Sequence, residues 1–340
     1  MPAKRHHFLP QFYLRGFLKH NRNQLNVIKL DDGDLFKTDT KNIGCETDWN
    51  RVGDDRSSIE EHFAKIDGQT SRLLSKIDHD EALPTDVDDI SLLFYFIARL
   101  SVHNPSSRDR LRKDRTNYLK HVGRWQTSSP GIYYEANKDK DIDKLVPYER
   151  MKKAVENLVD GKYKISFGHG YFLQHETKFI EQDLIPIFCN LHWSLLIAKD
   201  PTESFVCSDH PVLMNTGLTE LSGETELIPS VAFSLPLNRR ICLYAHSIGF
   251  LPEIYYISKE DWAGNSMLSV PHLNSRTIYM AQRHIYSGDL NWEMTTASGE
   301  KRNANSLIGK KIKDVVDTWY KQYHFEDNSL KNLALDTVRS

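Results

Sequence analysis

The chain has 340 residues, of which 39% are hydrophobic and 26% are charged, so it is long enough for one large folded domain or two average ones. This composition excludes a disordered chain and a small disulfide-rich scaffold. The 44 Lys and Arg residues nearly balance the 46 Asp and Glu residues, so a nucleic-acid or membrane partner would have to be recognised by a local patch.

The cysteine pattern and the longest apolar stretches indicate the compartment. The four cysteines form no CxxC pair, which excludes a zinc knuckle and a thioredoxin-type motif. The basic N-terminus lacks the apolar core of a signal peptide, and no stretch reaches the ~20 apolar residues that span a bilayer. We therefore expect a cytoplasmic protein with reduced thiols and no membrane partner.

The first half of the chain is predicted to form a β-hairpin followed by a bundle of helices. Two strand-like runs, residues 25–30 and 35–38, flank the turn-rich Asp31-Asp32-Gly33-Asp34. Helices are predicted over residues 57–77, 88–102, 108–124 and 147–159; the first has apolar residues at roughly helical spacing, and the third is strongly basic. The second of these is apolar on all faces, which is typical of a buried central helix.

The second half of the chain changes to a strand-like period. Short apolar runs bounded by turn residues predict strands over residues 193–198, 205–207, 233–237 and 241–244. Further helices are predicted over residues 269–286 and, as an amphipathic closing helix, 306–323. The predicted fold class is α+β, with an N-terminal β-hairpin, a central helical bundle, a sheet-rich second half and a C-terminal helix.

Two adjacent histidines open the chain's first motif. His6 and His7 precede the aromatic run Phe8 to Phe17, and neighbouring residues of a strand point to opposite faces, so one imidazole can enter a site while the other packs. Histidine serves as acid, base or metal ligand near neutral pH. A solvated pair beside core aromatics is an equally good interpretation.

A second motif follows the strand-like run that ends at Cys207. Strand ends commonly present catalytic or metal-binding groups, and here they are Ser208, Asp209 and His210. Members of a serine-hydrolase triad seldom adjoin in sequence, and no G-x-S-x-G elbow is present. A general base or metal ligand at Asp209 or His210 has the same weight as a turn held by Ser208 and Asp209.

A third motif lies near the start of the helix predicted over residues 269–286. Asn274 and Arg276 lie close to the helix N-terminus, where the dipole favours anions, so Arg276 can clamp an anion. An ordinary capping role is the simpler explanation of this motif.

The segment from Arg99 to Arg124 is the strongest local concentration of charge. Its only acids are Asp109 and Asp114, so its basic side chains can contact the phosphates of a nucleic acid. Trp125 beside it can stack on a base or pack in an interface. A solvated helix face that pairs with acids elsewhere is the alternative. The chain has no Walker loop, GxGxxG, HExxH, EF-hand or kinase signature.

Taken together, these motifs resemble a bacterial family known only as a domain of unknown function, numbered forty-two thirty-eight. The segment from His6 to Phe17 is similar to the family's HHxxPxFYLRxF opening, and Ser208-Asp209-His210-Pro211 is similar to its SDxP turn. Weaker landmarks are residues 41–44 and 46–49, the segment from Arg99 to Pro105, His192-Trp193, Pro236-Leu237 and Asn274. The resemblance extends to about residue 290, and the family often has Asn at the position of His210.

The resemblance implies no activity, but it implies that the histidine pair, the Ser-Asp turn and Asn274 belong to one architecture. We therefore expect residues 1–295 to form a single intertwined domain and residues 296–340 to form a C-terminal amphipathic helix and tail. Our hypothesis is that these residues converge on a pocket in which Arg15 or Arg99 binds an anion.

Three classes of function remain open. The first is a hydrolase or nuclease that acts on phosphodiester bonds, with or without a divalent metal. Its catalytic residues would be His6, His7, Asp209 and Asn274, and its substrate-binding residues would be Arg15, Arg99, Ser208 and His210. The second is a non-catalytic module that binds nucleic acid or protein through the Arg99 to Arg124 segment. The third is hydrolysis or transfer on a nucleotide or another small anion. The metal ligands and the oligomeric state are not predicted.

Overall fold

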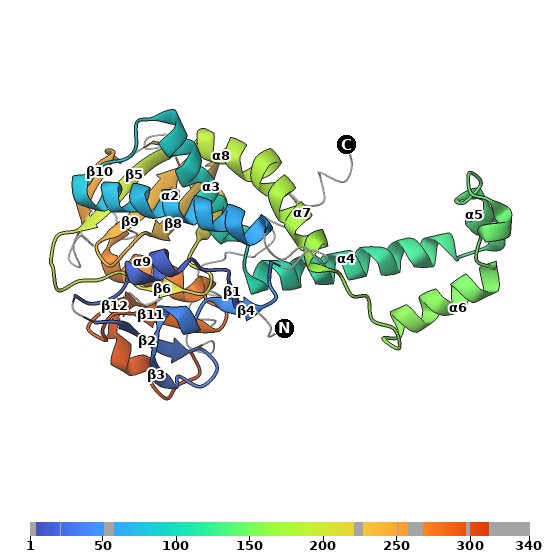
Figure 1. Ribbon diagram of the computed structural model, residues 1–340, viewed down its shortest axis with the longest axis horizontal. Helices are drawn as coiled ribbons and strands as arrows, with labels where there is room; N and C mark the ends of the chain where they lie inside the picture. The colour runs from blue at the N-terminus through green and yellow to red at the C-terminus, as the bar shows by residue number, and fades with distance from the viewer. Residues whose placement is uncertain are drawn as a thin grey trace. The chain divides into compact units, whose positions relative to one another are not determined.

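The computed structural model describes residues 5–20, 22–50, 58–220, 227–249, 251–257, 268–296 and 300–312. The chain divides into two compact units. Unit 1 combines Met1–Asn104 with His175–Ser340, and unit 2 is Pro105–Gln174. Helices and sheets are both present, which confirms the predicted α+β class (Figure 1).

The N-terminal part of unit 1 contains the predicted hairpin. Strands β2 (Gln24–Lys29) and β3 (Leu35–Asp39) pair antiparallel across a turn in which Gly33 has φ 70°. A side chain at Gly33 would meet the backbone of Leu307 and Lys310 at 2.5 Å, so glycine is required there. Before the hairpin, β1 (Arg5–His7) pairs antiparallel with β4 (Cys45–Thr47).

The hairpin extends into a four-stranded sheet of order β3-β2-β11-β6. Strand β11 (His284–Ser287) lies between β2 and β6 (Cys207–Ser208), antiparallel to both. The helix predicted over residues 269–286 is therefore wrong in its second half, because α9 (Val270–Met280) ends six residues earlier and the chain continues as a strand.

A five-stranded sheet forms the centre of unit 1. Its order is β10 (Ile254–Ile257), β5 (His192–Ala198), β9 (Ile241–His246), β8 (Leu227–Pro236) and β7 (Leu213–Glu220). Only β10 and β5 run parallel among these pairs. Leu195 and Ile197 lie in the largest core cluster, whereas Leu196 and Ala198 pack in the cluster that contains Leu273 of α9, as alternation along a strand requires.

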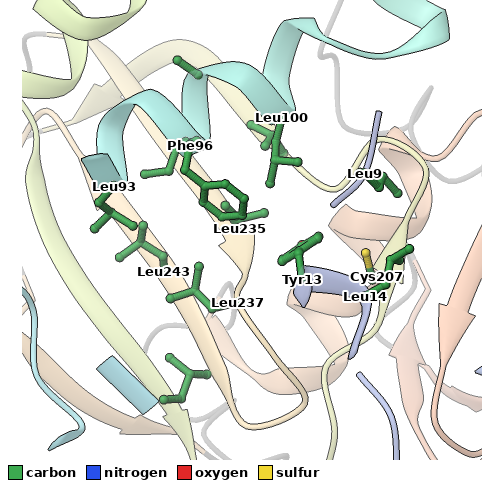
Figure 2. Close-up of a cluster of buried hydrophobic side chains, with 14 of the residues drawn as sticks. Leu9, Tyr13, Leu14, Leu93, Phe96, Leu100, Cys207, Leu235, Leu237 and Leu243 are labelled. Carbon is green, nitrogen blue, oxygen red and sulfur yellow. The ribbon is translucent and has the colours of Figure 1, made fainter. Parts of the chain in front are cut away.

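The largest core lies between this sheet and α3 (Val87–Val102). Asp86 caps α3 by accepting hydrogen bonds from the amides of Asp88 and Asp89. Phe96 and Leu93 of α3 lie beside Leu235 and Leu243 of the sheet, and Tyr13 enters from α1 (Gln11–Arg15) (Figure 2). The Tyr13 hydroxyl donates to the carbonyl of Pro236 at 2.7 Å, so the opening motif is anchored in the core.

The remaining elements of unit 1 are shorter or lie around this core. They are η1 (Thr40–Asn42), α2 (Ser58–Asp80), the π-helical turn Ile180–Leu184, α8 (Ile185–Cys189), β12 (Glu293–Thr295), β13 (Lys301–Asn303) and η6 (Ala304–Leu307). Helix α7 (His169–Phe179) crosses from unit 2 into unit 1. The segment over residues 179–188 is therefore helical.

Unit 2 is a helical hairpin. Helices α4 (Pro105–Gln126) and α6 (Tyr148–Val159) lie side by side, with α5 (Pro130–Glu135) and η2 (Ile142–Lys144) in the connection between them (Figure 1). A methyl group at Gly123 would lie 3.1 Å from Val155, so glycine permits the close approach. The two predicted helices are confirmed, and α5 adds a turn that Ser129 caps.

Two predictions concern the end of the chain. The closing helix predicted over residues 306–323 lies mostly outside the described residues, of which Ala304–Leu307 form a 3₁₀ turn. The boundary between domain 1–295 and tail 296–340 stays a prediction. Within the described ranges, no helix is both long enough and apolar enough to cross a membrane.

Candidate functional site

The two opening histidines point to opposite sides of β1, as expected. His6 is buried and faces the side of its register partner Glu46, whereas the half-buried His7 is opposite Cys45. The amide of Asn50 donates to Nδ1 of His6 at 2.9 Å. A ring nitrogen that accepts this bond is unprotonated, so neutral His6 carries its proton on Nε2.

A second buried histidine, His103 at the end of α3, bonds to Trp49, the residue next to Asn50. Nε1 of Trp49 donates to Nε2 of His103 at 3.1 Å, and Nδ1 of His103 lies 2.6 Å from Oε2 of Glu176. Because indole can only donate, His103 must carry its proton on Nδ1 and donate it to the Glu176 carboxylate. His103 and Glu176 resemble a catalytic base with its orienting carboxylate. Nε2 of His103, the nitrogen that would act on a substrate, is however occupied by the hydrogen bond from Trp49.

Arg99 joins this array through an aromatic ring. Its guanidinium lies 4.3 Å from the ring centroid of Phe63, which in turn contacts the ring of His103 at 5.6 Å. Nη1 of Arg99 also pairs with Asp67 at 2.7 Å, and the arginine is buried. Its charge is therefore balanced within the protein. We name His6, Trp49, Arg99, His103 and Glu176 the histidine network.

The structure connects β1 with the Ser-Asp turn through one ion pair. Oε1 of Glu46, the register partner of His6, lies 2.5 Å from Nη1 of Arg283. The amide of Arg283 in turn donates to Oδ2 of Asp209 at 3.0 Å. The predicted residues His6 and Asp209 are thus linked by Glu46 and Arg283 and do not bond to each other.

Asp209 is buried and holds the backbone that precedes β11. Its Oδ1 accepts the amide of Gln282 at 2.9 Å, and both of its oxygens accept from Arg283. Burial raises the pKa of Asp209, and the hydrogen bonds from Gln282 and Arg283 oppose that rise. This capture of backbone donors explains why the predicted helix gives way to a strand at His284.

The other two residues of the turn are equally buried. The Ser208 hydroxyl accepts the amide of His210 at 3.2 Å, which is the local turn predicted as the alternative to catalysis. Tyr286 of β11 is buried close by. Burial raises the pKa of Tyr286 well above its ordinary value, and the charges of Asp209, Cys207 and Cys45 raise it further. Tyr286 pairs with Cys207 across the β6–β11 ladder, directly before the Ser-Asp turn.

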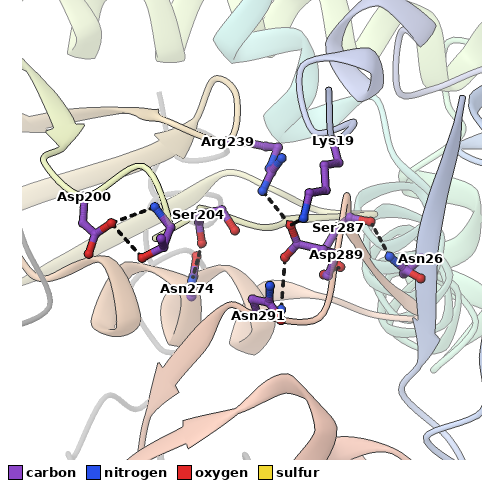
Figure 3. Close-up of polar contacts among 10 residues, drawn as sticks. Lys19, Asn26, Asp200, Ser204, Arg239, Asn274, Ser287, Asp289 and Asn291 are labelled. Atoms are coloured by element: carbon purple, nitrogen blue, oxygen red, sulfur yellow. Dashed lines mark hydrogen bonds and ion pairs between the residues drawn. The ribbon is translucent and has the colours of Figure 1, made fainter. Parts of the chain in front are cut away.

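Asn274 is fully buried and bonds to three separate backbone segments. Its Nδ2 donates to the carbonyl of Ser204 at 3.0 Å (Figure 3). Nδ2 also donates to the carbonyl of Glu293 at 2.9 Å, and Oδ1 accepts the amide of Val206 at 3.0 Å. These bonds join α9 to the segment before β6 and to β12. The geometry favours an architectural role for the side chain, and it is not a helix cap, since Ser269 caps α9.

Arg15 is exposed at the end of α1, and its predicted anion-binding role stays a prediction. Among the described residues, no group of three or more His, Cys, Asp or Glu side chains could hold a metal ion. The predicted site residues therefore divide into two members of the histidine network (His6 and Arg99), the half-buried His7, the buried turn over residues 208–210, the architectural Asn274 and the exposed Arg15.

Reasoning from the sequence missed several residues that complete these arrangements. Trp49 and the segment from Arg99 to Pro105 were among the landmarks of the family resemblance, and the Trp49–His103 bond brings those two landmarks together. Glu176 and Arg283 carried no signal, because their partners lie 73 and 237 residues away in the chain.

Comparison with known proteins gives a family but no activity. No curated protein and no solved structure matches the chain. The family model described as a protein of unknown function (DUF4238) matches residues 5–290, a span that includes β1, the Ser208-Asp209 turn and Asn274. The chain belongs to this family.

Proposed function

We propose that this chain is a nucleic-acid-binding protein whose contact surface is α4 in unit 2. The observation that carries the proposal is the division of charge between the units. Unit 2 has 15 Lys and Arg residues and nine Asp and Glu residues, which gives +6, so the rest of the chain carries −8. The near-neutral total hides a basic helical hairpin suited to a polyanion.

One exposed face of α4 carries a row of basic side chains. Arg110, Lys113, His121 and Arg124 are exposed and, with Asn117, follow one another at three or four residues, so they share one helix face. At about 1.5 Å rise per residue, that face is ~21 Å long. A row of this length can follow several phosphates of a bound nucleic acid.

Two aromatic rings accompany this basic face. Tyr118 is 49% exposed and Trp125 is 60% exposed, and both are one helical turn or less from His121. Stacking of a base on such a ring is worth about 1–3 kcal/mol, and it is available only when the base is not enclosed in a duplex. The combination favours single-stranded over double-stranded nucleic acid.

The test is fluorescence anisotropy of the full chain with a labelled 20-nucleotide single strand and the matching duplex. The variant Arg110→Gln/Lys113→Gln/Arg124→Gln removes three phosphate contacts. It should weaken binding about a hundredfold at 0.1 M salt and lower the slope of log K against log salt by about 2. The variant Trp125→Ala should weaken single-strand binding about tenfold and leave duplex binding nearly unchanged.

The matched control removes three exposed charges from α2 in unit 1, as Lys65→Gln/Arg72→Gln/Lys76→Gln. It makes the same change in net charge. Equal losses of affinity in the two triple variants would show that total charge, and not the α4 face, governs binding. No measurable binding at 50 mM salt would remove the proposal and favour a protein partner for the exposed aromatic residues.

A second candidate is a hydrolase or nuclease that acts on phosphodiester bonds. The observation that favours it is the buried pair of Glu176 with His103, which has the geometry of an oriented base, within a network that includes His6. Trp49 would have to withdraw before Nε2 of His103 could accept a proton. The predicted roles of His7, Asp209 and a divalent metal belong to this candidate. We also propose a cytoplasmic setting, which the four free cysteines support.

Cleavage of labelled single-stranded DNA and RNA with magnesium, manganese or zinc tests this candidate. Activity lost in His103→Gln and in Glu176→Gln, but raised in Trp49→Phe, would identify His103 as the base. Activity lost in His7→Ala and Asp209→Asn instead would assign it to β1 and the Ser-Asp turn. Intact substrates with a folded protein, in the presence of each metal, would reject the hydrolase.

A further inference from the structure

Unit 2 holds most of the large apolar side chains that the described part of the chain exposes. Eight of these eleven side chains lie in unit 2, although it is much the shorter of the two units. A concentration of exposed apolar side chains marks an interaction surface. Four of the eight are aromatic, and the contact proposed on α4 uses only Tyr118 and Trp125. Tyr134 and Tyr163 are left without a role.

These two tyrosines differ in the charge of their neighbours. Tyr163 is 55% exposed and lies between Lys162 and Lys164, which are both exposed. Tyr134 follows a buried tyrosine and precedes an acid. An exposed ring between two ammonium groups suits a ligand that alternates flat bases with phosphates, because the ring stacks on a base while the lysines meet the backbone.

The turn that ends α6 fixes the backbone of this tripeptide. Gly161 has φ 76°, the left-handed conformation typical of the residue that closes a helix. The amides of Lys162 and Tyr163 then donate to the carbonyl of Asn157 at 2.9 and 3.1 Å. These bonds occupy a carbonyl at the negative end of the helix dipole, so less negative charge opposes a nearby phosphate. The ring is also carried on an ordered backbone, which lowers the entropy cost of binding.

This end of α6 packs on the helix that carries the first contact. Val155 of α6 would lie 3.1 Å from a methyl group at Gly123 of α4, so the two helices approach closely there. Asn157, which holds the backbone of Tyr163, is two residues beyond Val155, and Trp125 is two residues beyond Gly123. The backbones that carry the two rings are therefore both close to one contact between the helices.

Both lysines are available to phosphates. Lys162 pairs with Asp160 at 3.3 Å, but both side chains are more than half exposed, and such a surface pair contributes little to stability. Lys164 forms no ion pair with any residue that the structure describes. A phosphate can therefore bind Lys164, or replace Asp160 beside Lys162, without leaving a buried charge unpaired.

We propose that Lys162, Tyr163 and Lys164 form a second contact for single-stranded nucleic acid, in which Tyr163 stacks on a base and the two lysines bind the adjoining phosphates. This inference rests on the function proposed for α4. It adds the path of the bound strand, which continues from α4 to the end of α6.

Fluorescence anisotropy of the full chain with a labelled 20-nucleotide single strand tests this contact. Tyr163→Ala should weaken binding about tenfold, whereas Tyr163→Phe, which keeps the ring, should change it less than twofold. Lys162→Gln/Lys164→Gln should lower the slope of log K against log salt by about 1.4, since each phosphate contact on a single strand contributes about 0.7. A strand that carries 5-iodouracil should photocross-link to the peptide that contains Tyr163.

Two matched controls lie in the connection between α4 and α6. Tyr134→Ala removes an exposed ring that has no lysine beside it, and it should leave the affinity within twofold. Lys138→Gln/Lys140→Gln makes the same change in net charge as the Lys162 and Lys164 variant. It should lower the salt slope by less than half as much.

The assay separates failure of this contact from failure of the proposed function. If the unaltered chain does not bind the strand, the function proposed for α4 fails and this inference fails with it. If the chain binds and Trp125→Ala weakens binding, but Tyr163→Ala has no larger effect than Tyr134→Ala, the second contact is overturned and the contact on α4 stands.

Discussion

Replacement of Asn274 by alanine is the sharpest test of how the family's motif residues act. The change removes the partner of the Val206 amide and of the Ser204 and Glu293 carbonyls, all at 2.9–3.0 Å and around a fully buried side chain. An unsatisfied buried polar group costs about 1–3 kcal/mol. Three such groups give an expected loss of about 3–6 kcal/mol, which is a large part of the ~5–15 kcal/mol that stabilises a typical domain.

Urea unfolding followed by tryptophan fluorescence measures this loss as a lower midpoint at unchanged slope. The matched control is Asn26→Ala. Asn26 is also buried, but its amide makes one long bond of 3.5 Å to the Ser287 carbonyl, so a loss of about 1 kcal/mol or less is expected.

The conservative variant Asn274→Asp separates bonding from volume. It keeps an acceptor for Val206 but replaces the two donors with an oxygen that faces the Ser204 and Glu293 carbonyls. It should therefore destabilise the protein at least as much as alanine does. A loss below about 1 kcal/mol in both Asn274 variants would refute the architectural role. So small a loss would make a catalytic role for Asn274 the better explanation.

Three further predictions follow from buried polar groups. Burial, and then the charge of Arg276, lower the pKa of His272 from 6.5 to about 3. The unfolded chain therefore binds the extra proton, stability falls as the pH drops from 6.5 towards 3, and about 2 kcal/mol is lost by pH 5. In His272→Gln, the free energy of unfolding should fall less between pH 6.5 and pH 5. A slope equal to that of the unaltered chain would refute the role of His272. Asp209→Ala should cost about 3 kcal/mol because it strands the Gln282 and Arg283 amides, whereas Asp209→Asn should cost about 1 kcal/mol; equal midpoints in urea would contradict this. Trp49→Phe should cost about 1–3 kcal/mol by removing the indole donor to His103, and an unfolding midpoint equal to that of the unaltered chain would contradict it.

Local pattern was sufficient for most elements of the fold. The sequence predicted α3, α4 and α6, and the turn at Gly33 predicted the β2–β3 hairpin, because each depends on residues that are neighbours in sequence. The failure after Met280 has a non-local cause. Ile278 and Ile285 fit a helical stripe, yet Asp209, about 73 residues earlier, takes the amides that a continued helix would have used.

The candidate site was predictable only in part for the same reason. Strand geometry predicts that His6 and His7 point to opposite sides, and in β1 His6 is buried while His7 is half-buried. The partners that define their surroundings come from elsewhere, since Trp49 reaches His103 across 54 residues and His103 reaches Glu176 across 73. No local periodicity contains such pairs, so only the family resemblance hinted that Trp49 and the end of α3 belong together.

Most of the motif residues behind the family resemblance form hydrogen bonds that fix the backbone or a neighbouring side chain. Asp209 secures the entry to β11, Asn274 joins three segments, and Trp49 fixes one tautomer of His103. Motif residues that hold the backbone explain a shared fold, and they leave any chemistry to other groups. The basic face of α4, for which we propose nucleic-acid contact, lies outside these motifs. Experiments on function are therefore better aimed first at α4 than at the residues that hold the backbone.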